Sequence, residues 1–349
     1  MRLGFTFNVR SIERASPQPP PEGGGLIGLA GDAEEEFDSP ETIDEIAGAL
    51  RSLGHEVELL GDGEPLLRRL LEGPRPDLVF NIAEGTGVAR SREARVPAVL
   101  EMLGIPHTGS DPLTLAVALN KPLAKTIVAA AGVAVPRGVT VQRSERRAGD
   151  VSPPIALRSL QAPLIAKPAF EGSSKGVLSK CLIEDAAALP AVVNELLEAY
   201  QQPILVEEFI EGDELTVGVL GNSPPQVLGV MRVVPQREER HFVYSLEVKR
   251  DWENRVRYEC PAALAPADTA AVEQAALAAY KALGCRDVAR IDFRLRRSVP
   301  YFIEANPLPG LAPKSSDIVL LARALGIEHR ELLRRILAAA VERYDLNDE

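Results

Sequence analysis

The stretch ARIDFRLRRSVPYFIEANPLPG, residues 289–310, carries the clearest structural pattern in the chain. If residues 289–295 and 301–306 are β-strands, their successive side chains point to opposite faces. The link between them, residues 296–300, is short. Because parallel strands need a long crossover, this short link predicts that the two strands pair antiparallel as a hairpin.

The predicted hairpin brings two acidic side chains face to face. A register centred on Ser298 places Asp292 opposite Glu304. The same register places Arg290 opposite Asn306. Two carboxylates directly across a ladder repel each other unless a cation lies between them. Mg²⁺ prefers a few carboxylate and amide oxygens together with substrate phosphates, so the predicted metal ligands are Asp292, Glu304 and Asn306.

The hairpin alone leaves a second interpretation open. Its acids are also compatible with an exposed sheet face, where they are solvated or form salt bridges with Arg290 and Arg294. The residues that follow favour the metal site. Pro307, Pro309 and Gly310 break the strand, so the backbone turns sharply and can approach a ligand closely, as binding loops do.

Composition sets the broad class of the protein. The 349 residues suffice for two or three domains, and 46% hydrophobic with 26% charged residues is typical of globular proteins. The formal charge of -11 gives no basic surface, so nucleic-acid binding is not expected. The three cysteines are widely spaced, which favours reduced thiols. A run of about 18 apolar residues is absent, so we expect a cytoplasmic protein that does not bind membranes.

The first hundred residues alternate between strand and helix patterns, which predicts a parallel sheet with crossover helices. A stretch rich in Pro, Gly and acids, residues 16–38, is predicted to be a mobile loop. The predicted strands are 3–7, 56–60 and 77–81, and the predicted helices are 40–53, 65–71 and 91–103.

Two α+β units are expected to follow, so the predicted domains are residues 1–109, 110–207 and 208–349. The second unit starts with one helix from Asp111 and Pro112 to about residue 131, where the Asp is an N-cap and the Pro is the first helical residue. Its other predicted elements are strands 138–142, 163–167, 176–182 and 204–209 and a helix at 187–200. In the third unit we expect strands 215–220 and 226–234, a charged loop, a helix at 266–283, the hairpin and two terminal helices.

The segment KPAFEGSSKG, residues 167–176, predicts a strand, a glycine-serine loop and a second strand. It does not match the P-loop pattern GxxxxGK[ST]. Backbone N–H groups and hydroxyls of such a flap can close over phosphates, while Lys167 supplies a positive charge. A glycine-serine hairpin that binds nothing is the alternative.

VARIDFRL and FIEANPLPGL together resemble the metal and acceptor segment of the D-alanine–D-alanine ligases of the ATP-grasp superfamily. The resemblance implies an ATP-grasp fold with an N-terminal parallel α/β domain. It also implies that Asp292, Glu304 and Asn306 hold two Mg²⁺ ions and that Arg290 stabilises the tetrahedral intermediate. Gly310 and Ser315 are implied to bind the carboxylate of the second amino acid.

KPxxEGSSxG resembles the phosphate loop of the same family, and ILVEEFIEGDELTVGVL, residues 204–220, resembles its adenine segment. The resemblance implies that Lys121 and Lys167 bind ATP and that Ser173 orients the first substrate. An extended edge is expected to present backbone groups to adenine, and a solvent-facing strand is the alternative. The implied nucleotide contacts are Glu171, Gly172 and Ser174 in the loop, Glu207, Glu208, Phe209 and Ile210 at the adenine, and Glu214 at the ribose.

The chain departs from the family at three places. Ala83 stands where the ligases carry a His near the acceptor amino acid. For the ammonium of the first substrate the candidates are Glu36 and Asp38, but a solvated charge run is the favoured interpretation of their loop. In the predicted mobile loop 237–260, the residue that closes the site is Lys249, Tyr244 or His241, of which Lys249 is chosen here.

The resemblance implies a reaction without a nucleophilic side chain. ATP phosphorylates one carboxylate to an acyl phosphate, and an amine attacks it to give an amide, ADP and phosphate. The implied cofactors are ATP and Mg²⁺, or Mn²⁺ in its place. The implied partners are small amino-acid substrates and a second copy in a homodimer, and the implied role is peptidoglycan precursor synthesis. The alternatives are a ligase for another amino-acid or peptide pair, or an ATP-binding protein without turnover.

Overall fold

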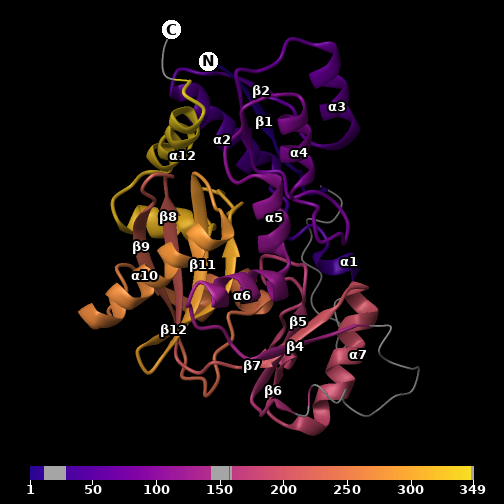
Figure 1. Ribbon diagram of the computed structural model, residues 1–349, viewed down its shortest axis with the longest axis vertical. Coiled ribbons are helices and arrows are strands. Elements are labelled where there is room, and N and C mark those ends of the chain that lie inside the picture. The colour runs from indigo at the N-terminus through magenta and orange to yellow at the C-terminus, as the bar shows by residue number, and fades with distance from the viewer. Residues whose placement is uncertain (12–28, 143–156, 158, 347–349) are drawn as a thin grey trace.

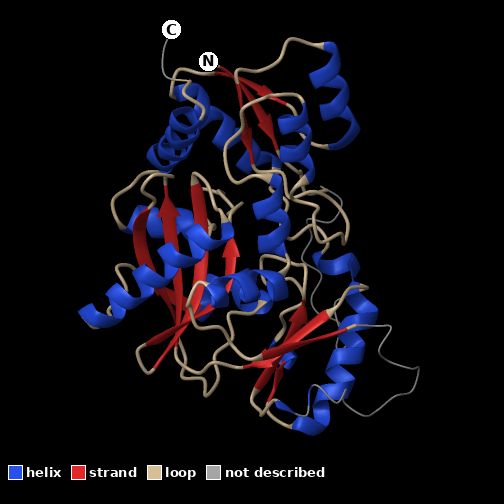
Figure 2. Ribbon diagram, viewed as in Figure 1, coloured by secondary structure: helices blue, strands red, loops and turns tan. Residues whose placement is uncertain are grey.

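The computed structural model describes residues 1–11, 29–142, 157 and 159–346, and it contains three β-sheets (Figure 1). One sheet is parallel and the other two are antiparallel. Figure 2 shows helices packed against each sheet. The predicted mixture of α/β and α+β architecture is confirmed.

The N-terminal sheet is formed by the strands that the alternating pattern predicts. β1 (Arg2–Thr6) lies between β2 (Glu56–Leu59) and β3 (Leu78–Asn81), and both pairs are parallel. The helices of this region are α2 (Pro40–Ser52), α3 (Gly63–Glu72) and α4 (Arg95–Met102). α2 begins at Ser39, whose hydroxyl accepts a hydrogen bond from the Thr42 amide, as an N-cap does.

The C-terminal helix completes the core of the N-terminal sheet. α12 (His329–Arg343) packs against α2, as Figure 1 shows. Leu333 and Ile336 of α12 belong to the same buried cluster as Leu3 and Phe5 of β1. β1 and α12 therefore share one hydrophobic core, although β1 is the first strand and α12 the last helix in the sequence.

The second sheet has the strand order β4-β7-β5-β6, and its pairs are antiparallel. Its strands are β4 (Gly138–Val141), β5 (Leu164–Pro168), β6 (Leu182–Ile183) and β7 (Ile204–Glu208). α7 (Leu189–Tyr200) covers it, because Val193, Leu196 and Leu197 form a buried stripe at helical spacing.

The third sheet has the strand order β10-β9-β8-β11-β12. Its strands are β8 (Asp213–Leu220), β9 (Gln226–Pro235), β10 (Val256–Glu259), β11 (Val288–Arg296) and β12 (Val299–Asn306). α10 (Pro266–Leu283) packs on it, and α11 (Asp317–Ala324) precedes α12. The domain boundaries at 109/110 and 207/208 stay a prediction; β7 crosses the second of them.

The helix predicted from Pro112 to about residue 131 is two helices, so that prediction is wrong. α5 (Pro112–Leu119) and α6 (Lys121–Ala130) meet at a bend of 104°. Asn120 caps α6, since its side chain accepts a hydrogen bond from the Leu123 amide. Among the described residues no single helix is long and apolar enough to span a membrane; α5 and α6 pass that test only when they are taken together.

Three loop predictions need correction. Residues 176–182 are not a strand: a 3₁₀ turn (Ser179–Cys181) precedes the two-residue β6, because Cys181 turns back to donate a hydrogen bond to the Gly176 carbonyl. The charged loop 237–260 contains α8 (Leu246–Arg250), α9 (Trp252–Arg255) and β10. Of the predicted mobile loop, residues 16–28 lie outside the described residues, and α1 (Leu29–Asp32) begins at residue 29.

Candidate active site

The β11–β12 hairpin has the predicted pairs. Asp292 lies opposite Glu304, and Arg290 lies opposite Asn306. The link between the strands is a turn of two residues, Arg297 and Ser298, and both have positive φ. The prediction of a five-residue link, 296–300, is therefore wrong.

A β-bulge accounts for the correct register despite the shorter turn. Beyond the turn Phe293 pairs with Phe302, whereas Asp292 pairs with Glu304, so Ile303 is an extra residue on β12. A bulge of this kind shifts the following side chains by one position. It therefore brings the two carboxylates directly across from each other.

The hairpin acids are buried in a cluster of opposite charges. Asp292 is only 9% exposed, and its Oδ2 accepts a hydrogen bond of 3.0 Å from Arg290. Glu304 lies 3.0 Å from Lys121 Nζ and 3.6 Å from Arg290 Nη2. The alternative of a solvated face is therefore wrong. Salt bridging is correct for Arg290 and wrong for Arg294, which pairs with Glu214 at 2.6 Å.

The pKa values of the two acids shift in opposite directions. Burial raises the pKa of Asp292 to about 6, although Arg290 opposes the shift. For Glu304 burial also acts upward, but Lys121 and Arg290 outweigh it and hold the pKa below its usual range. Two adjacent carboxylates and the Asn306 amide supply only oxygen donors of the kind that Mg²⁺ accepts, so this donor set fits the implied metal.

Asp317 is a site residue that sequence reasoning missed. Arg290 Nη1 donates to its Oδ2 at 3.2 Å, and the Tyr244 hydroxyl donates to its Oδ1 at 3.1 Å. Tyr258 lies 2.6 Å from the Tyr244 hydroxyl. Asp317 is the first residue of α11, where acids are common because of the helix dipole, and this position gave no signal of a role in the site.

One pocket collects the residues predicted for the nucleotide, except Gly172. Of the predicted residues it is lined by Lys121, Lys167, Glu171, Ser174, Glu207, Glu208, Phe209, Ile210, Glu214, Lys249, Asp292 and Glu304.

Glu207 is a buried acid that pairs with two lysines, and of these Lys167 lines the pocket. Lys167 Nζ lies 2.6 Å from Glu207, and Lys125 Nζ lies 3.2 Å from the same carboxylate. Burial lowers the pKa of Lys125 to about 8 against the opposing effect of Glu207. Lys125 was not predicted, and it lies one helical turn after Lys121 on α6. Lys121 also donates a hydrogen bond to the Glu171 carbonyl.

The adenine segment is a strand end and not an extended edge. β7 pairs with β4 on one side and with β5 on the other, and Glu207 is buried. Both the edge and the solvent-facing alternative are therefore wrong. Arg294 lies 4.5 Å above the Phe209 ring and donates to the Ile210 carbonyl, which fixes the segment after the strand.

The flap is closed by an ion-pair cluster with Glu36. The Glu36 side chain is 3% exposed, so its interpretation as part of a solvated charge run is wrong. It pairs with Arg92 at 2.8 Å and accepts a hydrogen bond from the Gly172 amide at 2.8 Å. Lys175 lies 3.3 Å from Glu36 and 2.7 Å from Glu171.

A second pocket collects the residues predicted for the substrates. It is lined by Arg290, Ser173, Gly310, Ser315 and Glu36. The predicted metal ligand Asn306 also lines it, and so does Gly172, which was predicted to contact the nucleotide. It shares Lys121, Glu171 and Glu304 with the nucleotide pocket, so the two pockets meet at these side chains. Asp38 also lines it, and burial raises the pKa of Asp38 to about 6.

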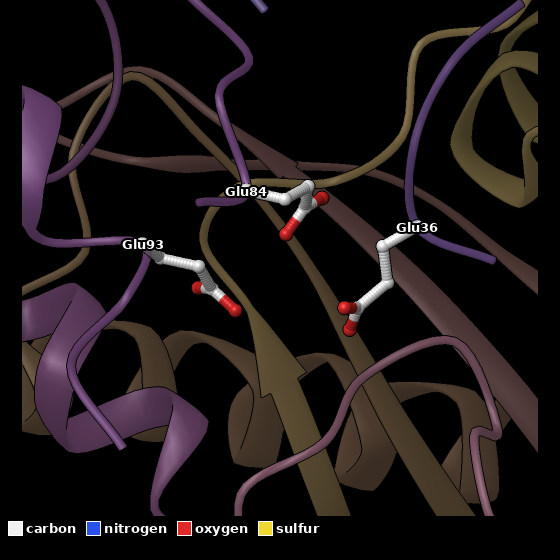
Figure 3. A group of neighbouring side chains, drawn as sticks. All are labelled: Glu36, Glu84 and Glu93. Carbon is white, nitrogen blue, oxygen red and sulfur yellow. The ribbon is translucent and has the colours of Figure 1, made fainter. Parts of the chain in front are cut away.

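Two further acids of the second pocket, Glu84 and Glu93, were missed. Ala83 is buried in a hydrophobic cluster, whereas the next residue, Glu84, lines the pocket. Figure 3 shows the Glu36, Glu84 and Glu93 carboxylates pointing into a common space, and each offers an oxygen within 4.8 Å of the others.

Of the three candidates for closing the nucleotide pocket, two line it. Tyr244 and Lys249 are part of its wall, with Lys249 Nζ 5.0 Å from the centre of the Tyr244 ring. His241 lines a separate hollow, where it lies 3.2 Å from Glu184 and 3.2 Å from Glu211.

The sequence family with the description "D-ala D-ala ligase C-terminus" matches residues 127–338. The chain belongs to the D-alanine–D-alanine ligase family. Similar members include the D-alanine–D-alanine ligase of Chelativorans, 35% identical over 77% of this chain and 82% of the relative. The ligase of Xanthomonas axonopodis is 33% identical over 88% and 92% of the two chains. A Sinorhizobium fredii protein, y4sG, is 31% identical over 97% and 95%.

The fold of the chain is also that of solved structures in this family. The D-alanine–D-alanine ligase of Bacillus anthracis, in complex with ATP, matches with a TM-score of 0.73, 22% identity and full coverage of both chains. The VanG D-Ala:D-Ser ligase of Enterococcus faecalis matches with a TM-score of 0.69, 21% identity and coverage of 97% of this chain and 99% of that one. The predicted family and the predicted ATP-grasp fold are therefore confirmed.

Proposed function

We propose that the protein is an ATP- and Mg²⁺-dependent carboxylate-amine ligase that forms an amide through an acyl phosphate. The observation that carries this proposal is the meeting of the two pockets at Lys121, Glu171 and Glu304. A nucleotide in the first pocket and a carboxylate in the second then share a boundary that is lined by a lysine and by a predicted metal ligand. Phosphoryl transfer requires such positioning more than it requires a nucleophilic side chain.

In the proposed reaction an oxygen of the substrate carboxylate attacks the γ-phosphorus of ATP, and ADP leaves. The amine of the second substrate then attacks the acyl carbon and loses a proton, and phosphate leaves. Lys121 and Lys167 are placed to neutralise phosphate oxygens. Asp292, Glu304 and Asn306 would hold Mg²⁺, which supplies further charge neutralisation when it is bound.

Arg290 is proposed to stabilise the oxyanion that develops at the acyl carbon. Its guanidinium lies in the substrate pocket and is held by Asp292, Glu304 and Asp317. Asp317 is outside the predicted metal ligands, so we propose that it positions Arg290. A protein that only binds ATP has no need of a buried arginine in the second pocket, and this disfavours the alternative without turnover.

The leading substrate pair is D-alanine with D-alanine, which the sequence resemblance implies and which would serve peptidoglycan precursor synthesis. A different amino-acid or peptide pair is the second candidate, because Glu84 and Glu93 line the substrate pocket beside Ala83. We further propose small-molecule partners, a cytoplasmic location and a homodimer. The three predicted domains belong to the same proposal.

Phosphate release from ATP with Mg²⁺ tests the proposed function. It is measured across D- and L-amino acids, singly and in pairs, and the products are identified by mass spectrometry. Release that depends on an amino acid, together with a product one water lighter than the two substrates, is expected. Release with D-alanine alone selects the first substrate pair, and release with another acid or amine selects the second candidate. Nucleotide binding without any such release would contradict the proposal.

A further inference from the structure

Glu84 and Glu93 both belong to the loop that joins β3 to α4, and both line the substrate pocket. Glu84 lies three residues after β3, and Glu93 lies two residues before α4. Figure 3 shows both carboxylates directed toward the space that they share with Glu36. The same pocket contains Arg290 and Asn306, so a molecule in contact with this pair can also reach the proposed reaction centre.

The charge of Glu36 is already compensated within the chain. Arg92 Nη2 donates to both of its oxygens, at 3.0 and 2.8 Å. The Gly172 amide donates at 2.8 Å, and Lys175 lies 3.3 Å away. Glu36 therefore has little capacity left for a ligand, although it was the residue predicted to bind one.

Glu84 and Glu93 lack such compensation. Neither carboxylate has a hydrogen bond or an ion pair to any residue in the described part of the chain, and Glu93 is only 7% exposed. The cations that act on them, Arg92 and Lys121, are already paired with other acids: Arg92 with Glu36 and Glu171, and Lys121 with Glu304. Burial raises the pKa of Glu93 to about 8 and that of Glu84 well above its usual range. The raised pKa values reflect the cost of a buried negative charge that has no partner. A positively charged ligand supplies that partner and so favours the ionised carboxylates.

An organic cation fits these two carboxylates better than a metal ion does. Glu36 is the third acid of the cluster, and Arg92 and Lys175 already occupy its oxygens. A divalent cation would then have only two acidic ligands beside a guanidinium. An ammonium or guanidinium group carries several N–H donors in one small volume and can donate to both carboxylates at once.

We propose that Glu84 and Glu93 form a subsite that binds a positively charged nitrogen of a substrate, either an ammonium or a guanidinium group. The inference rests on the proposed function in one respect: it takes the second pocket to be the substrate pocket. The nitrogen has two sources, the α-ammonium of an amino acid or the side chain of a basic one. The subsite selects cationic substrates over neutral molecules of the same shape.

Matched ligand pairs that differ in one positive charge test this subsite. The pairs are alanine and propionate, lysine and norleucine, and arginine and citrulline, each amino acid in both enantiomers. Their affinities are measured by calorimetry on the full chain in the presence of Mg²⁺ and a non-hydrolysable ATP analogue. The variants are Glu84→Gln, Glu93→Gln and the double variant. Glu72→Gln, an exposed acid on α3, is the matched control.

In at least one pair, the wild type is expected to bind the charged member at least about tenfold more tightly than the neutral member. This ratio is the order of magnitude that one hydrogen bond to a charged group contributes to affinity. The double variant should reduce this ratio to about one, each single variant should lower it, and Glu72→Gln should leave it unchanged. The pair that responds identifies the source of the nitrogen. If the double variant does not fold, the single variants still decide.

Three results would overturn the subsite. The first is a charge preference that persists in the variants. The second is a wild type that prefers no charged member of any pair. The third is a wild type that binds Mn²⁺ without nucleotide and a double variant that does not. Failure of the ligase proposal can be distinguished from failure of the subsite. Because these affinities need no turnover, a charge preference that the variants lose supports the subsite even if no phosphate is released. Amino-acid-dependent release with an unaltered preference in the double variant supports the ligase and not the subsite.

Discussion

Glu304 connects both pockets, and its charge is the most consequential in the site. It faces Asp292 across the hairpin and lies 3.0 Å from Lys121. Glu304→Gln keeps the shape but removes one predicted metal ligand. We expect amino-acid-dependent phosphate release to fall by about 100-fold or more, with an unchanged circular dichroism spectrum. Glu198→Gln, an exposed acid on α7, is the control, and retained activity in Glu304→Gln would refute the metal assignment.

Glu93 gives a prediction for the pH dependence of stability. Its pKa rises from an ordinary 4.5 to about 8, so the folded protein binds more protons than the unfolded chain between these values. The stability that the protonated carboxyl contributes is complete below about pH 4.5 and is lost as the pH rises toward 8. The charged groups around it are Arg92, Glu36, Glu84, Lys121 and Glu171.

Glu93→Gln should therefore be more stable than the wild type at pH 9, by an amount on the order of 2 kcal/mol. The two proteins should differ little near pH 4.5. Urea unfolding across this range measures the difference, and Glu93→Asp, which keeps a carboxyl group, is the control. Parallel stability curves for Glu93→Gln and the wild type would show that the carboxyl does not titrate as described.

At the residue scale, sequence reasoning found the groups with a recognisable order and missed those that only the folded chain assembles. Asp292, Glu304 and Asn306 could be predicted because one hairpin positions all three. Glu84 and Glu93 could not, because they are exposed-looking acids in loops, and their burial depends on the approach of Glu36 and the flap. A one-dimensional pattern contains no information on such an approach.

The hairpin is the element whose geometry can be tested most simply. Arg297 and Ser298 both adopt positive φ, which Asn and Gly tolerate better than other residues. The double substitution Arg297→Asn and Ser298→Gly should raise the free energy of unfolding by about 1 kcal/mol. Both side chains are exposed, so few other contacts change. A lower midpoint in urea would contradict the two-residue turn.

At the element scale, the predicted register of the β11–β12 hairpin is correct because two differences from the predicted geometry compensate for each other. The turn is shorter than predicted, and the bulge at Ile303 restores the pairing of Asp292 with Glu304. A bulge leaves no mark in side-chain alternation, so it could not be predicted. The bend between α5 and α6 could have been, because Asn120 followed by Pro122 is a cap followed by an early helical proline.

A buried contact joins α12 to the loop after α4 and to the segment before β11. Arg343 of α12 pairs with the fully buried Asp287 at 2.7 Å and donates to the carbonyls of His107 and Gly109. Arg343→Met should cost about 3 kcal/mol, because it leaves a buried carboxylate with one partner fewer. In the control, Arg335→Met removes only an exposed pair with Glu331 and should cost less than about 0.5 kcal/mol. Equal losses would contradict the assigned contact.

At the scale of the whole molecule, the sequence predicted the class of each sheet but not how α12 is used. Its amphipathic pattern shows that one face is buried, yet it does not name the surface that buries it. The structure places that face on the N-terminal sheet, with Leu333 beside the core of β1. The family resemblance gave the ATP-grasp fold, whereas residue patterns alone gave only the α/β and α+β classes.

The proposed reaction forms an acyl phosphate where the two pockets meet. It is tested most directly with a substrate whose carboxylate carries ¹⁸O in both oxygens. The attacking oxygen bonds to the γ-phosphorus and leaves with it when the amine forms the amide. We therefore predict one ¹⁸O atom in each phosphate that is released, as measured by mass spectrometry. Released phosphate without ¹⁸O would show that water attacks ATP, and it would contradict the account.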